Sequence, residues 1–286
     1  MEKINKNLLF FVFAILATMA ILFIVSEDKA NKKIQAEENR ITALRNSLAS
    51  VTVIAKAVSV YEVDTGIEIY GKNSDEALPL ASLVKSMTVA VVLPALQGKI
   101  ISLTPEAIAQ DGDFGLFANE KWKAEDLARL TLIVSANDGA YALAENTSNI
   151  LEKMEIKALK IGMKDASFKN STGLDTTLPT AYASALDANL MAMYMLKAYP
   201  DIASVTTSPE LALISESGFK HTFKNTNTGL GVLPPLLYSK TGYTDFAGGN
   251  LTIIFRDRDE HIYAVTILGS TFEGRFADMI KIANAL

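Results

Sequence analysis

The chain has 286 residues, 49% of them hydrophobic and 21% charged, with a net charge of −5 and no cysteine. This composition suits one sizeable globular domain and excludes thiol catalysis and thiolate metal sites. It gives no support to a nucleic-acid partner, which usually requires a basic surface. The two histidines, His221 and His261, lie in polar stretches typical of structural or solvated histidines. The sequence therefore gives little support to hydrolysis that depends on histidine or zinc.

The first predicted element is an apolar run of 18 residues, Leu8–Val25, with Lys3 and Lys6 ahead of it. At about 1.5 Å per residue, this run is just long enough to cross the hydrocarbon core of a lipid bilayer. The lysines predict a cytoplasmic amino terminus and an exported remainder. We expect residues 1–25 to be a cytoplasmic stub and an uncleaved signal-anchor. The alternative is a cleaved signal peptide that releases the protein, but no small-residue cleavage pair follows the run.

Residues 26–50 are charged and rich in helix-forming residues. Apolar side chains recur there at helical spacing, at Ile34, Ile41, Leu44 and Leu48. The pattern predicts a juxtamembrane stalk. The folded domain is expected over residues 51–286, on the periplasmic or wall-facing side of the membrane.

The folded region opens with a pattern typical of a β-hairpin, residues 57–63 and 67–70 around a glycine-containing turn. Ser82 then stands at the head of an apolar helical run, residues 87–96, which we expect to be buried on most sides. The stretch 123–145 predicts two helices joined by a polar break at Ser135–Gly139.

Residues 181–199 predict a further helix that ends at Pro200. Later in the chain, three apolar or alternating runs indicate strands of one sheet, at residues 236–241, 249–255 and 262–268. A closing helix is expected at residues 277–286. Strands at both ends and helices between them predict an α/β (α+β) fold, in which an antiparallel sheet from both chain ends carries an inserted helical lobe.

The candidate catalytic and binding residues fall into three short motifs, at residues 82–85, 135–137 and 240–242. The first, Ser-x-x-Lys, is weak alone, because the same spacing recurs at Ser26–Lys29 and Ser217–Lys220. Ser-x-Asn and Lys-Thr-Gly occur once each, and they follow in the order that serine acyl-transfer enzymes use. The ordered trio predicts an acyl-transfer site that needs neither histidine nor metal.

Ser82 is the predicted nucleophile and Lys85 its base, since residues three apart lie on one face of a helix. Lysine can accept the serine proton only if its pKa falls well below about 10.4. Burial lowers a lysine pKa, and so would a second ammonium group, that of Lys240. The backbone N–H of Ser82 could also donate to an oxyanion. Alone, this pair is more typical of a helix start whose lysine points to water.

Ser135 and Asn137 flank the break between two predicted helices, where side chains can project into a cleft. Ser135 could relay a proton between Lys85 and the leaving group, and Asn137 could hold Lys85 and the substrate amide. Ordinary helix capping is the alternative for this pair.

Lys240, Thr241 and Gly242 end a strand-like run. Lys240 and Thr241 would bind a terminal carboxylate, and Gly242 would let a substrate backbone approach and pair as an added strand. The N–H of Tyr243 could be the second oxyanion donor. A turn with a solvated lysine is the alternative.

Over residues 51–286 the sequence resembles the serine-type D-alanyl-D-alanine carboxypeptidases, which are low-molecular-mass penicillin-binding proteins. The stretches that carry the resemblance are residues 80–88, 135–140, 168–174, 225–227 and 240–244. The resemblance implies a β-lactamase/transpeptidase-like fold. It also implies acylation of Ser82 by peptidoglycan stem peptides ending in D-Ala-D-Ala, release of D-alanine, hydrolysis of the acyl-enzyme and inhibition by β-lactams.

Three rival functions stay open on the same fold. A β-lactamase would usually have Ser-Asp-Asn and a glutamate-bearing loop, whereas this chain has Ser-Ala-Asn and no convincing loop of that kind. A D,D-endopeptidase could use the same site on crosslinks. A catalytically silent wall-binding protein would not need the intact serine and lysines.

Overall fold

The computed structural model describes residues 6–286, apart from the side chains of residues 6–9, 12, 14, 15, 17, 20, 21, 24 and 25. The chain divides into two compact units, Met1–Ser47 and Leu48–Leu286. The second unit begins close to Val51, where the sequence places the start of the folded domain.

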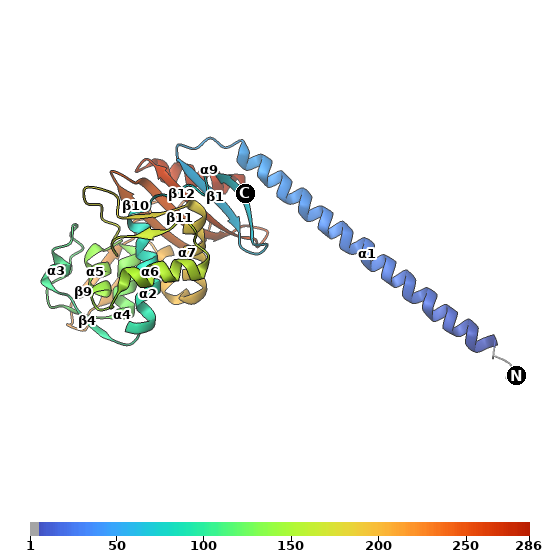
Figure 1. Ribbon diagram of the computed structural model, residues 1–286, viewed down its shortest axis with the longest axis horizontal. Coiled ribbons are helices and arrows are strands. Elements are labelled where there is room, and N and C mark those ends of the chain that lie inside the picture. The colour runs from blue at the N-terminus through green and yellow to red at the C-terminus, as the bar shows by residue number, and fades with distance from the viewer. Residues whose placement is uncertain (1–5) are drawn as a thin grey trace. The chain divides into compact units, whose positions relative to one another are not determined.

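The first unit is formed by one long helix, α1 (Lys6–Ala49), drawn in blue in Figure 1. The charged stretch predicted as a helical stalk is part of this helix. Across the described residues, no helix is long and apolar enough to cross a membrane. The structure thus lends no support to the signal-anchor expected at Leu8–Val25. Lys3, which contributes to the predicted orientation, and several side chains of that segment lie outside the described residues.

The second unit is built on a five-stranded antiparallel sheet with strand order β10-β11-β12-β1-β2. Its strands are β1 (Ala57–Glu62), β2 (Ile67–Lys72), β10 (Leu236–Thr244), β11 (Gly248–Arg256) and β12 (Ile262–Ser270). The first strand of the chain therefore pairs with the last, so the prediction of one sheet from both chain ends is confirmed. β10 lies at one edge of this sheet.

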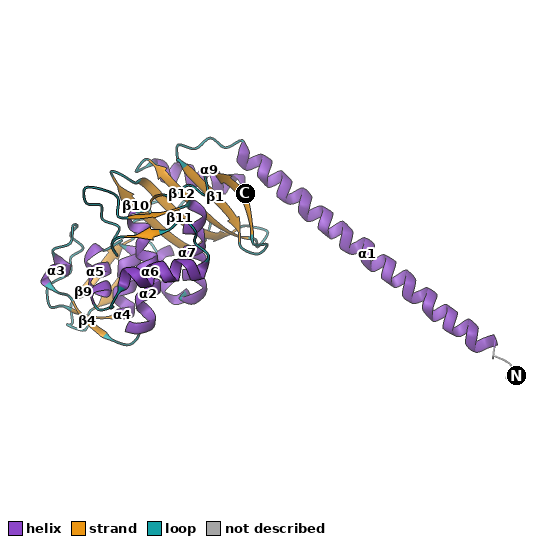
Figure 2. Cartoon of the chain, in the orientation of Figure 1, coloured by secondary structure: helices purple, strands orange, loops and turns teal. Residues whose placement is uncertain are grey.

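The segment between β2 and β10 forms the predicted helical lobe, with several short strands (Figure 2). Its helices are η1 (Ala81–Leu83), α2 (Val84–Leu96), α3 (Pro105–Ile108), α4 (Ala124–Ile133), α5 (Asn137–Glu145), α6 (Ile150–Ile161), α7 (Ala185–Ala198), α8 (Pro200–Ser204) and η2 (Val205–Thr207). Its short strands are β3 (Leu78–Pro79), β4 (Ile100–Ser102), β5 (Lys121–Lys123), β6 (Ser167–Phe168), β7 (Ala181–Ala183), β8 (Glu210–Ile214) and β9 (Lys220–Lys224). The chain closes with α9 (Gly274–Ala285).

Two element predictions need correction. The helix predicted over residues 181–199 is interrupted, because Ala181–Ala183 pairs as β7 with both β3 and β6, and α7 begins only at Ala185. Pro200 does not end helical structure. It occupies the first turn of α8, where a proline has no hydrogen bond to lose.

The helix that follows Ser82 lies in the centre of this unit. Every residue of α2 from Val84 to Leu93 is buried, as its apolar sequence predicts. The central strands β11 and β12 are buried along most of their length, with α7 and α9 packed against them. The start of α2 therefore rests in a rigid interior, and η1 packs directly against the edge strand β10.

Candidate active site

Ser82 lies in the 3-10 turn η1, and Lys85 lies one turn later at the start of α2. The Lys85 Nζ atom is 2.7 Å from Ser82 Oγ. The same Nζ donates to Asn137 Oδ1 at 2.7 Å and to the Thr172 carbonyl oxygen at 2.6 Å. Three oxygen atoms from separate parts of the chain thus surround one buried amine.

The position of Lys85 changes its acidity. Burial lowers the pKa of this lysine from 10.5 to about 7, and the negative charge of Asp138 partly opposes the shift. A fully buried ammonium loses its hydration, which favours the neutral form. The sequence indicates two possible causes for a lowered Lys85 pKa, burial and the charge of Lys240. Burial is the main cause found for Lys85.

The break between α4 and α5 places Ser135 and Asn137. It is shorter than predicted, because α5 already begins at Asn137. Ser135 has a left-handed backbone with φ of 63°, a strained conformation for a residue with a side chain. Asn137 Nδ2 donates to the Asp111 carbonyl at 2.6 Å, which fixes the amide with its oxygen toward Lys85.

Lys240 lies on β10 and is as deeply buried as Lys85. Its Nζ donates to Ser135 Oγ and to the Thr241 carbonyl, both at 2.9 Å. Burial lowers the pKa of Lys240 well below its usual value, and the positive charges of Lys85 and Arg275 lower it further. Ser135 therefore contacts the second lysine, whereas the sequence predicted a relay beginning at Lys85.

The remaining part of the third motif lies beside Ser82. Thr241 Oγ1 is 2.6 Å from Thr226 Oγ1, within hydrogen-bonding distance. A Cβ on Gly242 would lie 2.8 Å from the Leu80 carbonyl and 3.2 Å from the Ser82 nitrogen, so only glycine fits this close approach of strand and turn. Tyr243 follows at the sheet edge and is 45% exposed.

Two features of the site were not predicted. The first is the Thr172–Gly173 segment, whose carbonyl accepts the Lys85 amine. Gly173 has φ of 77°, and a Cβ there would lie 2.1 Å from the Ala81 carbonyl. This segment belongs to a stretch that carries the family resemblance, but a backbone acceptor leaves no residue-type signal in a sequence.

The second is Arg275, at the start of α9. Its Nη1 donates to the Gly242 carbonyl at 2.8 Å, and its guanidinium lies over the Phe272 ring. Its buried Nε has no hydrogen-bond partner among the described residues. No motif surrounds Arg275 in the sequence, and only the packing of α9 against the sheet brings it to Gly242.

The two histidines lie outside this site. His221 Nε2 is 2.7 Å from the buried Glu120 Oε1, and His261 Nδ1 is 3.6 Å from Glu62 Oε1. Over the residues described, no group of three or more His, Cys, Asp or Glu side chains could hold a metal ion. The chance match at Ser217 lies in an exposed turn, where Ser217 Oγ accepts from the Lys121 backbone.

Comparisons with a family model and with curated proteins agree on one family. A family model described as D-alanyl-D-alanine carboxypeptidase matches residues 43–271. The D-alanyl-D-alanine carboxypeptidase DacF of Bacillus subtilis is 35% identical over 241 residues, covering 80% of this chain and 61% of that protein. A D-alanyl-D-alanine endopeptidase of Escherichia coli is 29% identical over 226 residues, covering 72% and 69%. The chain thus spans about three-fifths of the length of the carboxypeptidase DacF.

Solved structures show the same fold. Ampicillin-bound penicillin-binding protein D2 of Listeria monocytogenes is 28% identical with a TM-score of 0.69, covering 82% of this chain and 98% of that one. A D-alanyl-D-alanine carboxypeptidase of Mycobacterium tuberculosis has a TM-score of 0.74 at 22% identity, covering 82% and 93%. The predicted mixed fold, with its antiparallel sheet and helical lobe, is confirmed by this likeness.

Proposed function

The chain belongs to the D-alanyl-D-alanine carboxypeptidase family, and we propose that it is a serine D,D-carboxypeptidase. It removes the terminal D-alanine from peptidoglycan stem peptides through an acyl-enzyme on Ser82. The observation that carries this proposal is the contact between a buried, low-pKa Lys85 and the Ser82 hydroxyl.

The hydrogen bonds of Lys85 support its role as the base. A neutral amine has two N–H donors and one lone pair. Asn137 Oδ1 and the Thr172 carbonyl oxygen can act only as hydrogen-bond acceptors, so they accept both N–H groups of the neutral amine. The lone pair is then left for the Ser82 proton. With a pKa of about 7, a large part of the Lys85 population is neutral near neutral pH.

Acylation then proceeds through a tetrahedral intermediate. Lys85 accepts the proton of Ser82, and Ser82 Oγ attacks the carbonyl carbon of the penultimate D-alanine. The oxyanion forms beside the backbone N–H groups of Ser82 and Tyr243. When the C–N bond breaks, the nitrogen of the departing D-alanine takes the proton that Lys85 accepted from Ser82, and we expect Ser135 to lie on the path of that proton.

Lys240 supports recognition of the substrate's terminal carboxylate. Its ammonium group borders the site from β10, next to Thr241 and close to the positive charge of Arg275. A negative ligand would offset the repulsion among these cations and favour protonated Lys240. β10 is an edge strand, and an edge strand is where an extended peptide can pair with the backbone of a sheet. Water finally hydrolyses the ester, with Lys85 again accepting a proton.

A labelling experiment with the full chain tests this proposal. Fluorescent penicillin presents a strained amide next to a carboxylate, and we expect one covalent adduct, on Ser82. Ser82→Ala should lose the label, while Ser217→Ala and Ser26→Ala, at the two chance Ser-x-x-Lys matches, should keep it. Peptide mapping that places the adduct on another serine would refute the assignment.

A second function, D,D-endopeptidase activity on crosslinks, is favoured by the likeness to the Escherichia coli endopeptidase. The same serine and lysines would perform both reactions. Parallel assays with a D-Ala-D-Ala pentapeptide and a crosslinked muropeptide dimer separate them by the product released. A β-lactamase would instead turn over penicillin rapidly, and a silent wall-binding protein would bind peptide without releasing D-alanine.

The site of action is proposed to be outside the cytoplasm, where peptidoglycan lies. The apolar run Leu8–Val25 and the lysines ahead of it support export and, if uncleaved, membrane attachment. This part of the proposal depends on the amino-acid sequence alone. Amino-terminal sequencing of the mature protein decides it, because a start between Ser26 and Ala36 would mean that the segment is a cleaved signal peptide.

A further inference from the structure

The Thr172 carbonyl belongs to a loop, residues 170–174, that is held by the amide of one of its own side chains. Asn170 Oδ1 accepts from the Gly173 N–H at 2.8 Å and from the Thr172 N–H at 3.3 Å. Asn170 Nδ2 donates to the Leu174 carbonyl at 2.7 Å, which fixes the direction of the amide. A single side chain therefore holds three consecutive residues of this loop in place.

The hydrogen bond from Gly173 to Asn170 determines where the Thr172 carbonyl points. The Thr172 C=O and the Gly173 N–H belong to one planar peptide group, and they point in opposite directions. Because Asn170 holds the N–H, the carbonyl faces Lys85, whose Nζ lies 2.6 Å from the oxygen. Gly173 has φ of 77°, but glycine tolerates either sign of φ, so its own backbone does not prevent this peptide group from flipping. Asn170 selects one of the two orientations.

A second hydrogen bond ties the loop to the helix that carries the base. Thr88 is buried on α2, about one turn after Lys85, and its Oγ1 donates to the Ser171 carbonyl at 2.7 Å. The N–H of that same peptide group belongs to Thr172 and donates to Asn170. This peptide group is therefore held on both sides, and the loop is fixed to the same part of α2 as the base.

A flip of the carbonyl would misdirect the base. The neutral Lys85 amine donates to this carbonyl and to Asn137 Oδ1, which leaves its lone pair for the Ser82 hydroxyl. After a flip, the Gly173 N–H would face the amine instead of an acceptor. The lone pair would then turn toward that N–H and away from Ser82. The orientation of one loop peptide thus decides whether the amine can take the serine proton.

We propose that Asn170 and Thr88 are positioning residues for the catalytic base, which together keep the Thr172 carbonyl directed at Lys85. The proposal rests on the D,D-peptidase function given above and adds two residues to that site. Both side chains act through the loop peptides and not on the substrate.

Single-turnover labelling of the full chain with fluorescent penicillin tests this role, because it separates binding from acylation. For Asn170→Ala we expect the acylation rate at saturation to fall about 10- to 100-fold, since a base contributes about 10²- to 10⁴-fold and would be misdirected part of the time. The penicillin concentration that gives half of this rate should change little. The fraction of protein finally labelled corrects for inactive molecules.

Thr88 provides a second pair of variants. Thr88→Val replaces the hydroxyl with a methyl group, and the acylation rate should fall about three- to tenfold, the value of one ordinary hydrogen bond. Thr88→Ser keeps a hydroxyl that can donate to the Ser171 carbonyl, so it should restore most of the rate.

The pH profile distinguishes positioning from a general loosening of the site. When the Lys85 ammonium loses an acceptor, its pKa should fall further below about 7, so the acidic limb of acylation should move to lower pH. The charged groups that act on or near Lys85, Asp138 on α5 and Lys240 on β10, are unchanged in these variants. A loosened site would instead admit water, raise the pKa of Lys85 toward 10.5 and move the limb to higher pH.

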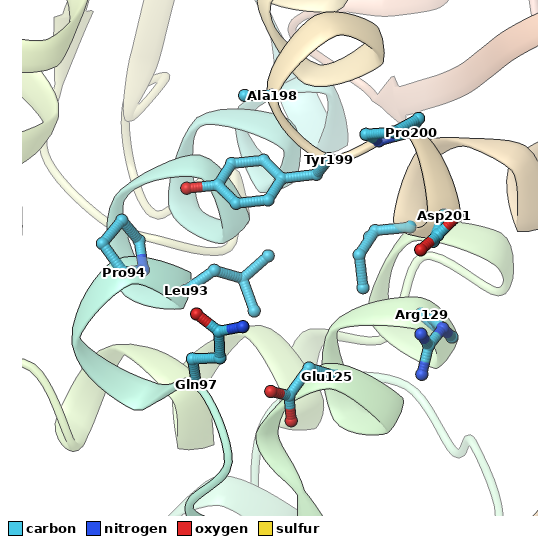
Figure 3. Close-up of a pocket in the computed structure, with 10 residues that line it drawn as sticks. Leu93, Pro94, Gln97, Glu125, Arg129, Ala198, Tyr199, Pro200 and Asp201 are labelled. Carbon is cyan, nitrogen blue, oxygen red and sulfur yellow. The ribbon is translucent and has the colours of Figure 1, made fainter.

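The far end of α2 supplies a control for the loss of an amide. Figure 3 shows the cavity there, of about 510 Å³, with Gln97 and Tyr199 in its lining. None of the described residues that line it belongs to the loop or to the predicted active site. Gln97→Ala removes an exposed amide and should acylate like the wild type.

A buried threonine outside the site is the control for Thr88→Val. Thr147 is buried, and its Oγ1 donates to the Leu143 carbonyl at 3.3 Å. Thr147→Val should keep the wild-type rate and pH profile. If Asn170→Ala acylates at the wild-type rate, or its limb stays in place or moves to higher pH, this proposal is wrong while the peptidase function stands. Equal losses in Thr88→Val and Thr88→Ser would also contradict it. If Ser82 of the wild type takes no penicillin, both proposals are wrong.

Discussion

The helical lobe and the sheet each contribute one buried lysine to the site, and the two lysines differ in their surroundings. Lys85, from α2, is enclosed by three oxygen atoms and lies near the negative charge of Asp138. Lys240, from β10, has two oxygen partners and lies near two positive charges, those of Lys85 and Arg275. Burial lowers both pKa values, but the neighbours decide what each amine can do.

The comparison teaches that burial alone does not define a base. The fixed acceptors around Lys85 orient a neutral amine toward the Ser82 hydroxyl. The cations around Lys240 instead make a place that is favourable for an anion. One lysine is therefore suited to move a proton and the other to hold a carboxylate. Four substitutions test this division and the geometry around it, and the expected effect is largest for Lys85→Arg and smallest for Asp138→Asn.

Lys85→Arg should nearly abolish acylation, because arginine keeps the charge but cannot release its proton at working pH. A lost general base costs about 10²- to 10⁴-fold in rate. The measurement is the second-order rate constant for fluorescent penicillin. Lys220→Arg, in the chance Ser-x-x-Lys match, should react like the wild type. A near-normal rate in Lys85→Arg would show that the helical-lobe lysine is not the base.

Gly242→Ala should have the next largest effect. The new Cβ would be 2.8 Å from the Leu80 carbonyl and 3.2 Å from the Ser82 nitrogen, so strand and turn must separate. Loss of one oxyanion donor costs about 10²- to 10³-fold, and partial displacement should cost up to about 10². Gly231→Ala, where no atom lies within 4 Å of the added carbon, is the matched control. An unchanged acylation rate would show that the approach of β10 to Ser82 is not needed.

Lys240→Gln should impair recognition of the carboxylate rather than chemistry. We expect kcat/KM for a D-Ala-D-Ala peptide to fall about 10- to 100-fold, the value of one hydrogen bond to a charged group. The same peptide ending in D-alaninamide lacks the carboxylate and should lose much less. Equal losses on both peptides would assign Lys240 to proton transfer, which would remove the proposed difference between the two lysines.

The sequence singled out the residues of the proposed site but not some of the groups that contact them. Ser82, Lys85 and Lys240 carry side chains whose chemistry is recognisable in a motif, and the fold brings them together. The Thr172 carbonyl could not be predicted in the same way, because every residue type offers one. Arg275 was missed because its contact with Gly242 depends on the packing of α9 against β11 and β12 and on no local pattern.

The errors in secondary structure have a similar origin. Residues 181–199 are rich in alanine, leucine and methionine, which favour helix, yet Ala181–Ala183 forms a strand because β3 and β6 offer partners on both sides. Long-range pairing overrides local propensity there. The sheet strands were predictable because β11 and β12 are buried on both faces and therefore read as apolar runs.

The smallest expected effect concerns Asp138, whose charge raises the pKa of Lys85 against the effect of burial. The base must be neutral, so kcat/KM for acylation should rise with pH and level off above about 7. Asp138→Asn removes the charge and keeps an oxygen that can accept from the Gly139 N–H, as Asp138 Oδ1 does at 2.6 Å. The Lys85 pKa should then fall, so the acidic limb of the profile should move to lower pH. At pH 6 the variant should acylate at most several-fold faster than the wild type, and both should reach the same plateau at high pH.

Burial also raises the pKa of Asp138 itself to about 6, so the difference should shrink again below that pH, where wild-type Asp138 is protonated. A limb that stays in place, or moves to higher pH, would mean that Lys85 does not sense this charge, and the contrast between the neighbours of the two lysines would lose its electrostatic basis.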